Sequence, residues 1–80
     1  MSVIWDAIVE TDIDPDRVSQ TPDGVWHVSD DAGLWLVNFC VQEDESGTEW
    51  VEVWQEDGSV DSFDYADLDR AIARVAEWSR

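Results

Sequence analysis

Electrostatic self-repulsion is the feature that most constrains how this chain folds. Its 80 residues include 20 Asp and Glu against four Arg and no Lys, which gives a formal net charge of −16 at pH 7. A charge of this size destabilises any compact state. The same chain contains six Trp, whose large apolar rings favour burial or contact with a partner. The sequence therefore predicts an acidic surface built around, or beside, a set of indoles that bind.

The length and composition predict a single folded domain over residues 1–80. A chain of this size supports one modest core, and its 44% hydrophobic and 11% aromatic content argue against disorder. The first residues lack a basic leader, and no apolar run approaches the roughly 18 residues of a membrane span. A lone cysteine, Cys40, forms no internal disulfide. We therefore expect a cytoplasmic protein without membrane association.

Apolar runs separated by turn residues predict an antiparallel meander in the middle of the chain. The predicted strands are residues 25–28, 34–41, 49–55 and a weaker 59–63. Between the last two strands, Asp57-Gly58 suits a two-residue type I′ hairpin turn, which needs positive φ at both central residues.

The C-terminal residues 65–79 predict an amphipathic helix. Leu68, Ile72, Val75 and Ala76 recur at helical spacing and form one apolar stripe, and Asp64 can serve as the N-cap. Acidic residues near the start of this helix and Arg near its end suit the helix dipole.

The N-terminal segment fits two structures, because residues 3–9 alternate like a strand while Ile4, Trp5 and Ile8 line one side of a helix. The helix is favoured, and Asp14-Pro15 predicts a capped helical turn after it. The predicted fold class is therefore α+β: an antiparallel three- to four-stranded meander packed against a C-terminal helix, with a short N-terminal helix or strand.

The register of the two central strands decides where several tryptophans lie. A five-residue loop over residues 43–47 places Val37 and Phe39 opposite Val51 and Val53, in a core under the C-terminal helix.

With this register, Trp50 and Trp54 flank Glu52 on the second face of the sheet, whereas a loop shorter by one residue would bury both indoles. Strict alternation puts Trp35 on the core face with Val37. In an alternative arrangement the N-terminal segment covers the second face, and all six Trp lie in or near the core.

Two groups of residues resemble chemical sites only superficially. Asp12, Asp14 and Asp16 have the spacing that opens a calcium loop, and Asp23 falls at its twelfth place, but Arg17 stands where that loop needs Gly. Helix capping and solvated charge are the simpler interpretation of these aspartates.

The sequence also offers no nucleophile with a matched base. His27 and Cys40 are the one pair of suitable types, and a thiol between Phe39 and Val41 in a strand is typical of an inert buried side chain. No glycine-rich phosphate loop or His-rich metal motif is present. We therefore expect no enzymatic activity, no cofactor and no metal.

The acidic clusters are the candidate partner-binding residues. Carboxylates on one face of a strand repeat at about 6.7 Å, which is of the order of the phosphate spacing along a DNA strand with its rise of about 3.4 Å per nucleotide. Such a surface repels nucleic acid and anionic membranes, so the natural partner is a basic nucleic-acid-binding protein or ribonucleoprotein. The candidate residues, with two interleaved indoles, are Asp30, Asp31, Glu43, Asp44, Glu45, Glu49, Trp50, Glu52, Trp54, Glu56 and Asp57.

In size, charge and lack of catalytic groups, the chain resembles the small phage-encoded DNA-mimic inhibitors, which include the uracil-DNA glycosylase inhibitor and several anti-CRISPR proteins. The likeness is carried by Glu43-Asp44-Glu45, by residues 49–57 and by the acidic start of the last helix. The resemblance implies an inhibitor in the host cytoplasm that occupies the basic groove of a host defence complex and blocks its binding to target DNA.

Two other functions fit the same composition. An Asp-rich, Lys-free surface keeps small domains of halophiles soluble in concentrated salt, although that role needs no Trp. An antitoxin or immunity protein that neutralises a basic enzyme would also be acidic.

Overall fold

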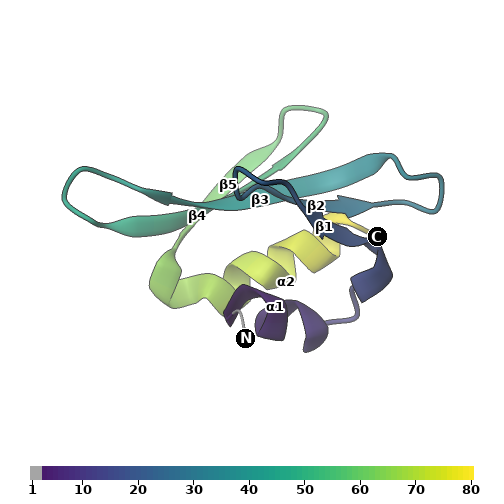
Figure 1. Cartoon of the computed structure of the whole chain (residues 1–80), viewed down its shortest axis with the longest axis horizontal. Helices are drawn as coiled ribbons and strands as arrows, with labels where there is room; N and C mark the ends of the chain where they lie inside the picture. Colours follow the sequence, from purple (N-terminus) through teal and green to yellow (C-terminus); the bar gives the residue numbers. More distant parts are fainter. Residues whose placement is uncertain (1–2) are drawn as a thin grey trace.

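The chain folds into one five-stranded antiparallel sheet with two helices packed against one of its faces (Figure 1). The structure is a computed structural model that describes residues 3–80. The sheet order β1-β2-β3-β4-β5 follows the chain, with β1 (Val18–Gln20), β2 (Trp26–Ser29), β3 (Trp35–Glu43), β4 (Glu49–Gln55) and β5 (Val60–Asp64). The helices are α1 (Val3–Val9) and α2 (Leu68–Trp78), and two 3-10 turns are η1 (Pro15–Arg17) and η2 (Tyr65–Asp67). This α+β meander confirms the predicted fold class.

The N-terminal segment adopts the helical alternative, and the capped turn after it forms as predicted. The Asp14 carboxylate accepts a hydrogen bond from the Asp16 N–H at 2.9 Å, with Pro15 at the first position of η1. The strand β1 that follows was not predicted. Its three residues pair with β2, and a run of three is too short to show an alternating pattern.

The C-terminal helix forms with a shorter α-helical part than predicted. Its first turn is the 3-10 turn η2, and α2 begins only at Leu68. Asp64 occupies the N-cap position before η2, as predicted, but its side chain makes no capping hydrogen bond. No helix within residues 3–80 has the length and apolar character needed to cross a membrane.

All four hairpins use the same turn, which differs from the predicted one. In each, the first residue donates its N–H to the carbonyl four residues on and accepts from the N–H of a Gly three residues on. Within residues 3–80, positive φ occurs only at Gly, including Gly58 at 93°. This is the three-residue hairpin loop that ends in a left-handed Gly. The type I′ turn predicted at Asp57-Gly58 is therefore wrong, because Asp57 keeps negative φ.

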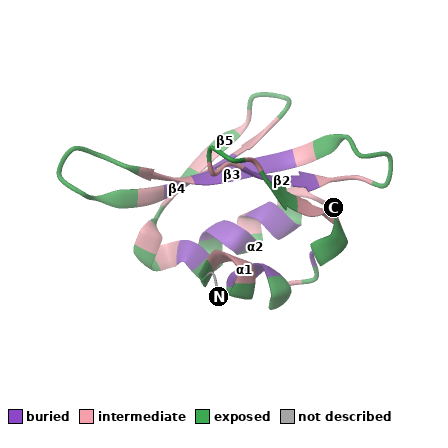
Figure 2. Cartoon of the chain, in the orientation of Figure 1, coloured by how far each residue is buried: buried purple, intermediate pink, exposed green. Residues whose placement is uncertain are grey.

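The core lies between the sheet and the helices, where Figure 2 shows buried residues on α2 and in the middle of the sheet. Phe39 pairs with Val53 and Val41 with Val51, which confirms the predicted core face. The predicted loop over residues 43–47 is wrong, because Glu43 still pairs with Glu49. The register is displaced accordingly, and Val37 lies opposite Gln55 rather than a valine. From α2, the predicted apolar stripe packs on this face, with Leu68, Ala71, Ile72, Val75 and Ala76 all buried.

An aromatic stack joins α1 to the sheet. The Trp26 ring of β2 lies between Trp5 of α1 and Phe39 of β3, with ring centroids 6.3 Å and 5.8 Å apart. Helix α1 thus packs on the same side as α2, and the alternative in which the N-terminal segment covers the second face is wrong. Helix α1 packs there because Trp5 stacks on Trp26, whose ring lies on the core side of the sheet.

A β-bulge moves Trp35 away from the core. Val28 pairs with Val37, but the next pair is Ser29 with Trp35, so Leu36 is an extra residue in β3. The Trp35 ring stacks on the His27 ring at 3.8 Å, on the face opposite the helices. The prediction that Trp35 shares the face of Val37 is wrong, because strict alternation fails at the bulge.

Replacement of Val53 by Ala is expected to lower the free energy of unfolding by about 2–3 kcal/mol, since it empties space around a side chain that is 0% exposed. The same substitution at Val60, which is 63% exposed on the edge strand β5, should cost less than about 1 kcal/mol. Urea unfolding followed by circular dichroism measures both changes. Equal losses in the two variants would contradict the placement of the core.

Candidate partner-binding surface

The sheet surface opposite the helices is covered by no other element of residues 3–80 (Figure 1). We call it the open face. Its central residues follow from the strand register and comprise His27, Trp35, Asn38, Cys40, Gln42, Trp50, Glu52, Trp54, Val60, Ser62 and Asp64. The face therefore mixes indoles with polar and acidic groups, whereas the core face is almost wholly apolar.

Strand β4 places a carboxylate between two indoles on this face, as predicted. Trp50 and Trp54 are each half-buried, and Glu52 lies between them. The Trp50 Nε1–H donates to Glu52 Oε1 at 3.2 Å. This bond holds the Glu52 side chain along the strand, so its carboxylate stays beside the Trp50 ring on the open face.

A second group of predicted residues lies at the turn between β3 and β4. We call Glu43, Asp44, Glu45 and Glu49 the acidic tip. Glu43 and Glu49 face each other directly across the two strands, an arrangement that is unfavourable for like charges. The tip makes no ion pair with any residue from 3 to 80, so its charge is available to a cationic partner.

Hydrogen bonds within the turn hold one carboxylate of the acidic tip in place. Asp44 accepts from the Ser46 hydroxyl at 2.6 Å and from the N–H groups of Ser46 and Thr48 at 2.9 Å and 3.0 Å. These bonds, led by that of the Ser46 hydroxyl, hold the pKa of Asp44 below its usual value. Asp44 therefore keeps its charge under mildly acidic conditions.

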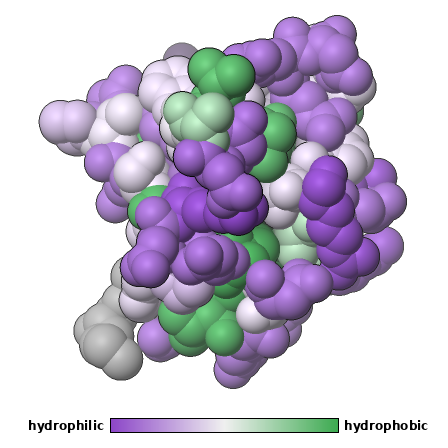
Figure 3. Space-filling view, turned by 90° about the vertical axis from the view of Figure 1, so that its right-hand side faces the viewer, coloured by the Kyte–Doolittle hydropathy of each residue, from purple (hydrophilic) through white to green (hydrophobic). Residues whose placement is uncertain are grey.

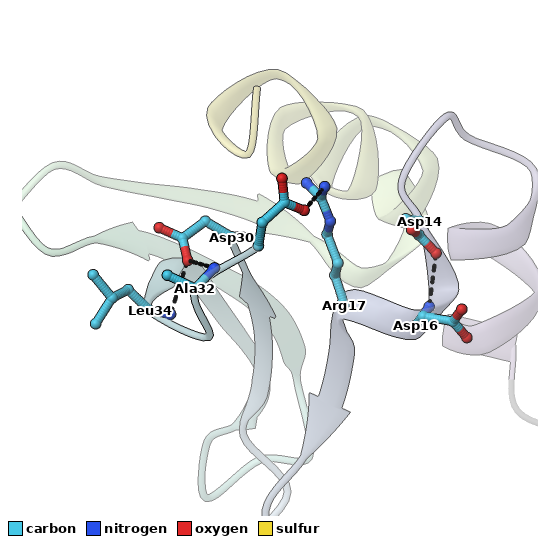
Figure 4. Close-up of polar contacts among 7 residues, drawn as sticks. Asp14, Asp16, Arg17, Asp30, Ala32 and Leu34 are labelled. Atoms are coloured by element: carbon cyan, nitrogen blue, oxygen red, sulfur yellow. Dashed lines mark hydrogen bonds and ion pairs between the residues drawn. The ribbon is translucent and has the colours of Figure 1, made fainter.

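The remaining predicted residues lie at the opposite end of the sheet, where two of them have internal partners (Figure 4). Asp30 accepts from the N–H groups of Ala32 and Leu34 at 2.8 Å and 3.0 Å, and Asp31 forms an ion pair with Arg17. Both aspartates thus stabilise the β2–β3 turn. Figure 3 faces this end and shows a mostly hydrophilic surface interrupted by small hydrophobic areas.

The turn between β4 and β5 brings two more carboxylates to this end of the sheet. Asp57 accepts from the Ser59 N–H at 2.8 Å, which lowers the pKa of Asp57, and Glu56 is exposed beside it. The predicted residues do not form one cluster. Those from Glu43 to Asp57 follow β4 from the acidic tip, past the two indoles, to the β4–β5 turn, whereas Asp30 and Asp31 lie in the β2–β3 turn.

Three residues that lie on or beside this surface were missed in the sequence. His27 and Asn38 are 5% and 7% exposed, and His27 Nδ1 is hydrogen-bonded to Asn38 Oδ1. Trp35 covers His27 from the solvent side. The available signal was a polar residue between apolar neighbours in each of two predicted strands, but pairing His27 with Asn38 required the register.

The basic residues are segregated from the sheet. Residues 18–69 include fourteen of the 20 acidic residues and none of the four Arg, which lie on η1, on α2 and at the C-terminus. Arg74 pairs with Asp61 and Glu77 at 3.5 Å, and Arg80 pairs with Asp12 at 3.2 Å. Of the aspartates with the calcium-like spacing, Asp14 thus caps η1 and Asp12 forms an ion pair.

Cys40 on the open face is not an activated nucleophile. Burial raises the pKa of the Cys40 thiol, which keeps it protonated and weakly nucleophilic. Among residues 3–80, no cluster of three or more His, Cys, Asp or Glu side chains is arranged to hold a metal ion. What this surface can do is attract and bind cationic groups.

Replacement of Ser46 by Ala is expected to raise the pKa of Asp44, because the Ser46 hydroxyl is the main cause of its lowering. The pKa of Asp57, which is held low by Ser59, should not change. A lowered folded-state pKa stabilises the fold above the unfolded value near 3.9, and this stabilisation is lost as the pH falls through the folded pKa. The variant should therefore lose less stability than the wild type on acidification.

Carboxyl ¹³C NMR titration measures both pKa values, and urea unfolding at several pH values measures the stability. An equal shift at Asp44 and Asp57 would show that the hydroxyl does not act locally.

Comparison with known proteins gives no relative: no family model matches the chain, and neither a curated protein nor a solved structure is detectably similar to it.

Proposed function

We propose that this protein binds a basic nucleic-acid-binding surface of another protein or ribonucleoprotein by imitating the charge of nucleic acid. The observation that carries the proposal is charge density. A net charge of −16 on a molecule 40 Å long is one charge per 2.5 Å of its long axis, and duplex DNA has one per about 1.7 Å. A groove that binds DNA would therefore attract this protein as well.

The placement of the charges supports this function. The sheet and its turns bear most of the carboxylates without any Arg or Lys, so a partner approaching β4 meets negative charge alone. Charge of this kind raises the association rate and orients the partner. The indoles of the open face then supply apolar contact area, which dominates the energy of most interfaces.

Our more specific proposal is that the groove belongs to a defence complex of the host and that its occupation blocks binding of target DNA. The support for it is the resemblance to acidic DNA-mimic inhibitors described above.

A partner captured from host lysate at low salt should lose bound duplex DNA when the protein is added. Neutralising the acidic tip by Glu43→Gln, Glu45→Gln and Glu49→Gln should weaken this competition on the order of tenfold, because several interfacial charges of modest energy add up. A control with the same change in charge on the helical side should weaken it no more than about twofold. Its substitutions are Asp6→Asn, Glu10→Gln and Glu77→Gln.

Displacement of a fluorescent duplex, followed by anisotropy at increasing salt, measures the competition. Affinity that stays constant between low and moderate salt would refute the proposal, as would a captured partner that retains its DNA.

A second candidate function is a salt-adapted domain of a halophile. The observation that favours it is that exposed carboxylates also occur on the helical side, at Asp6, Glu10, Asp69 and Glu77. Concentrated salt would screen their mutual repulsion.

This second function predicts that the fold is lost in dilute buffer and recovered in molar salt. Circular dichroism at both salt concentrations tests it. A full helical and strand signal in dilute buffer would exclude an obligate dependence on salt.

A further inference from the structure

A buried polar atom without a partner lies under the open face. His27 is 5% exposed, its Nδ1 is bonded to Asn38 Oδ1, and its Nε2 has no hydrogen-bond partner within the described chain. A buried polar group left unpaired costs about 1–3 kcal/mol. Native proteins retain few such atoms, and those they retain call for an explanation.

The chemistry of this atom is fixed by its neighbour. The Asn38 oxygen can only accept a hydrogen bond, so Nδ1 donates its N–H to it. In the tautomer whose single ring proton lies on Nδ1, Nε2 has a free lone pair in the plane of the ring. The missing partner is therefore a hydrogen-bond donor.

The group that covers His27 is itself half-exposed. Trp35 stacks on the imidazole with an interplanar angle of 13°, yet it is 48% exposed. It also lies next to the β-bulge at Leu36, where the pairing of β2 and β3 is irregular. A small displacement of the Trp35 indole would open the edge of the imidazole without disturbing the core on the other side of the sheet.

The surroundings select a cationic donor. Glu52 lies on the same face, on β4 next but one to Trp54, which pairs with Asn38, and residues 18–69 contain no Arg or Lys to compensate it. A guanidinium group donates N–H bonds in its own plane and stacks well on an indole. It can therefore lie beside the imidazole, donate to Nε2 and remain parallel to the overlying Trp35 ring. An ammonium group offers no plane that could stack in this way.

We infer that the open face binds an arginine side chain of the partner, whose guanidinium donates to His27 Nε2 and stacks against Trp35. The inference rests on the proposed function, because it assumes a basic partner. It goes further by naming the residue type that the partner presents and the place where it binds. Charge attraction by the acidic tip would bring the partner close, and this site would distinguish arginine from lysine.

The test compares peptides of nine arginines and nine lysines, which have the same charge. The arginine peptide should bind at least about fivefold more tightly, because it adds a stacked cation–π contact and a hydrogen bond to the common attraction. Tryptophan fluorescence measures both affinities. In the wild-type protein, ¹⁵N NMR of the His27 ring should show a shift of Nε2 with the arginine peptide and little change with the lysine peptide.

Two substitutions locate the preference. Trp35→Leu keeps an apolar cover but removes the stacking surface, and His27→Phe keeps a ring but removes the acceptor. Each should reduce the arginine preference to less than about twofold, while the salt-dependent binding of both peptides remains. Val9→Ala, at an exposed position of α1 on the other side of the sheet, should leave the preference unchanged.

The outcomes separate the two proposals. Equal affinities for the two peptides, or a preference that survives both substitutions, would overturn the arginine site and leave the acidic mimic intact. Failure of both peptides to bind at low salt would overturn both. The NMR shift of His27 decides the question in the wild type even if a variant does not fold.

Discussion

Burial of one apolar layer holds this structure together against its own charge. The layer joins one face of the sheet to α2 and α1, and its central side chains, such as Phe39, Val51 and Val53, are 0% exposed. The ion pairs lie at the surface, where each contributes little. Since small domains have little stability to spare, every carboxylate must lie where it does not disturb this layer.

The hairpin turns accommodate several of these carboxylates away from the core. Each hairpin has the same three-residue loop, and several loop carboxylates accept backbone N–H groups that the turn leaves free. Asp44 and Asp57 are thus both surface charges and structural parts of the turn, which is why the pKa of each is lowered. Negative charge at these positions stabilises the turns, while it adds to the electrostatic repulsion across the whole molecule.

The sequence patterns with a strict period led to correct predictions. The apolar stripe of α2 and the alternation of β4 predicted both elements and the positions of Trp50, Glu52 and Trp54 correctly. The errors arose where geometry departs from the period. The bulge at Leu36 places Trp35 on the open face instead of the core face, and the three-residue β1 is too short to show a pattern. The candidate site was predicted less well, because Asp30 and Asp31 bond within the chain, and composition does not reveal such internal partners.

The excess charge opposes self-association through the open face. Half-exposed indoles on an uncovered sheet favour association with any apolar surface, including a second copy of the chain. Two copies in contact through this face, each with a net charge of −16, would repel one another strongly. The same field attracts a cationic partner and leaves the face free for it. The charge therefore opposes self-association through the indoles and favours the basic partner proposed above, so neither the indoles nor the carboxylates alone would specify that partner.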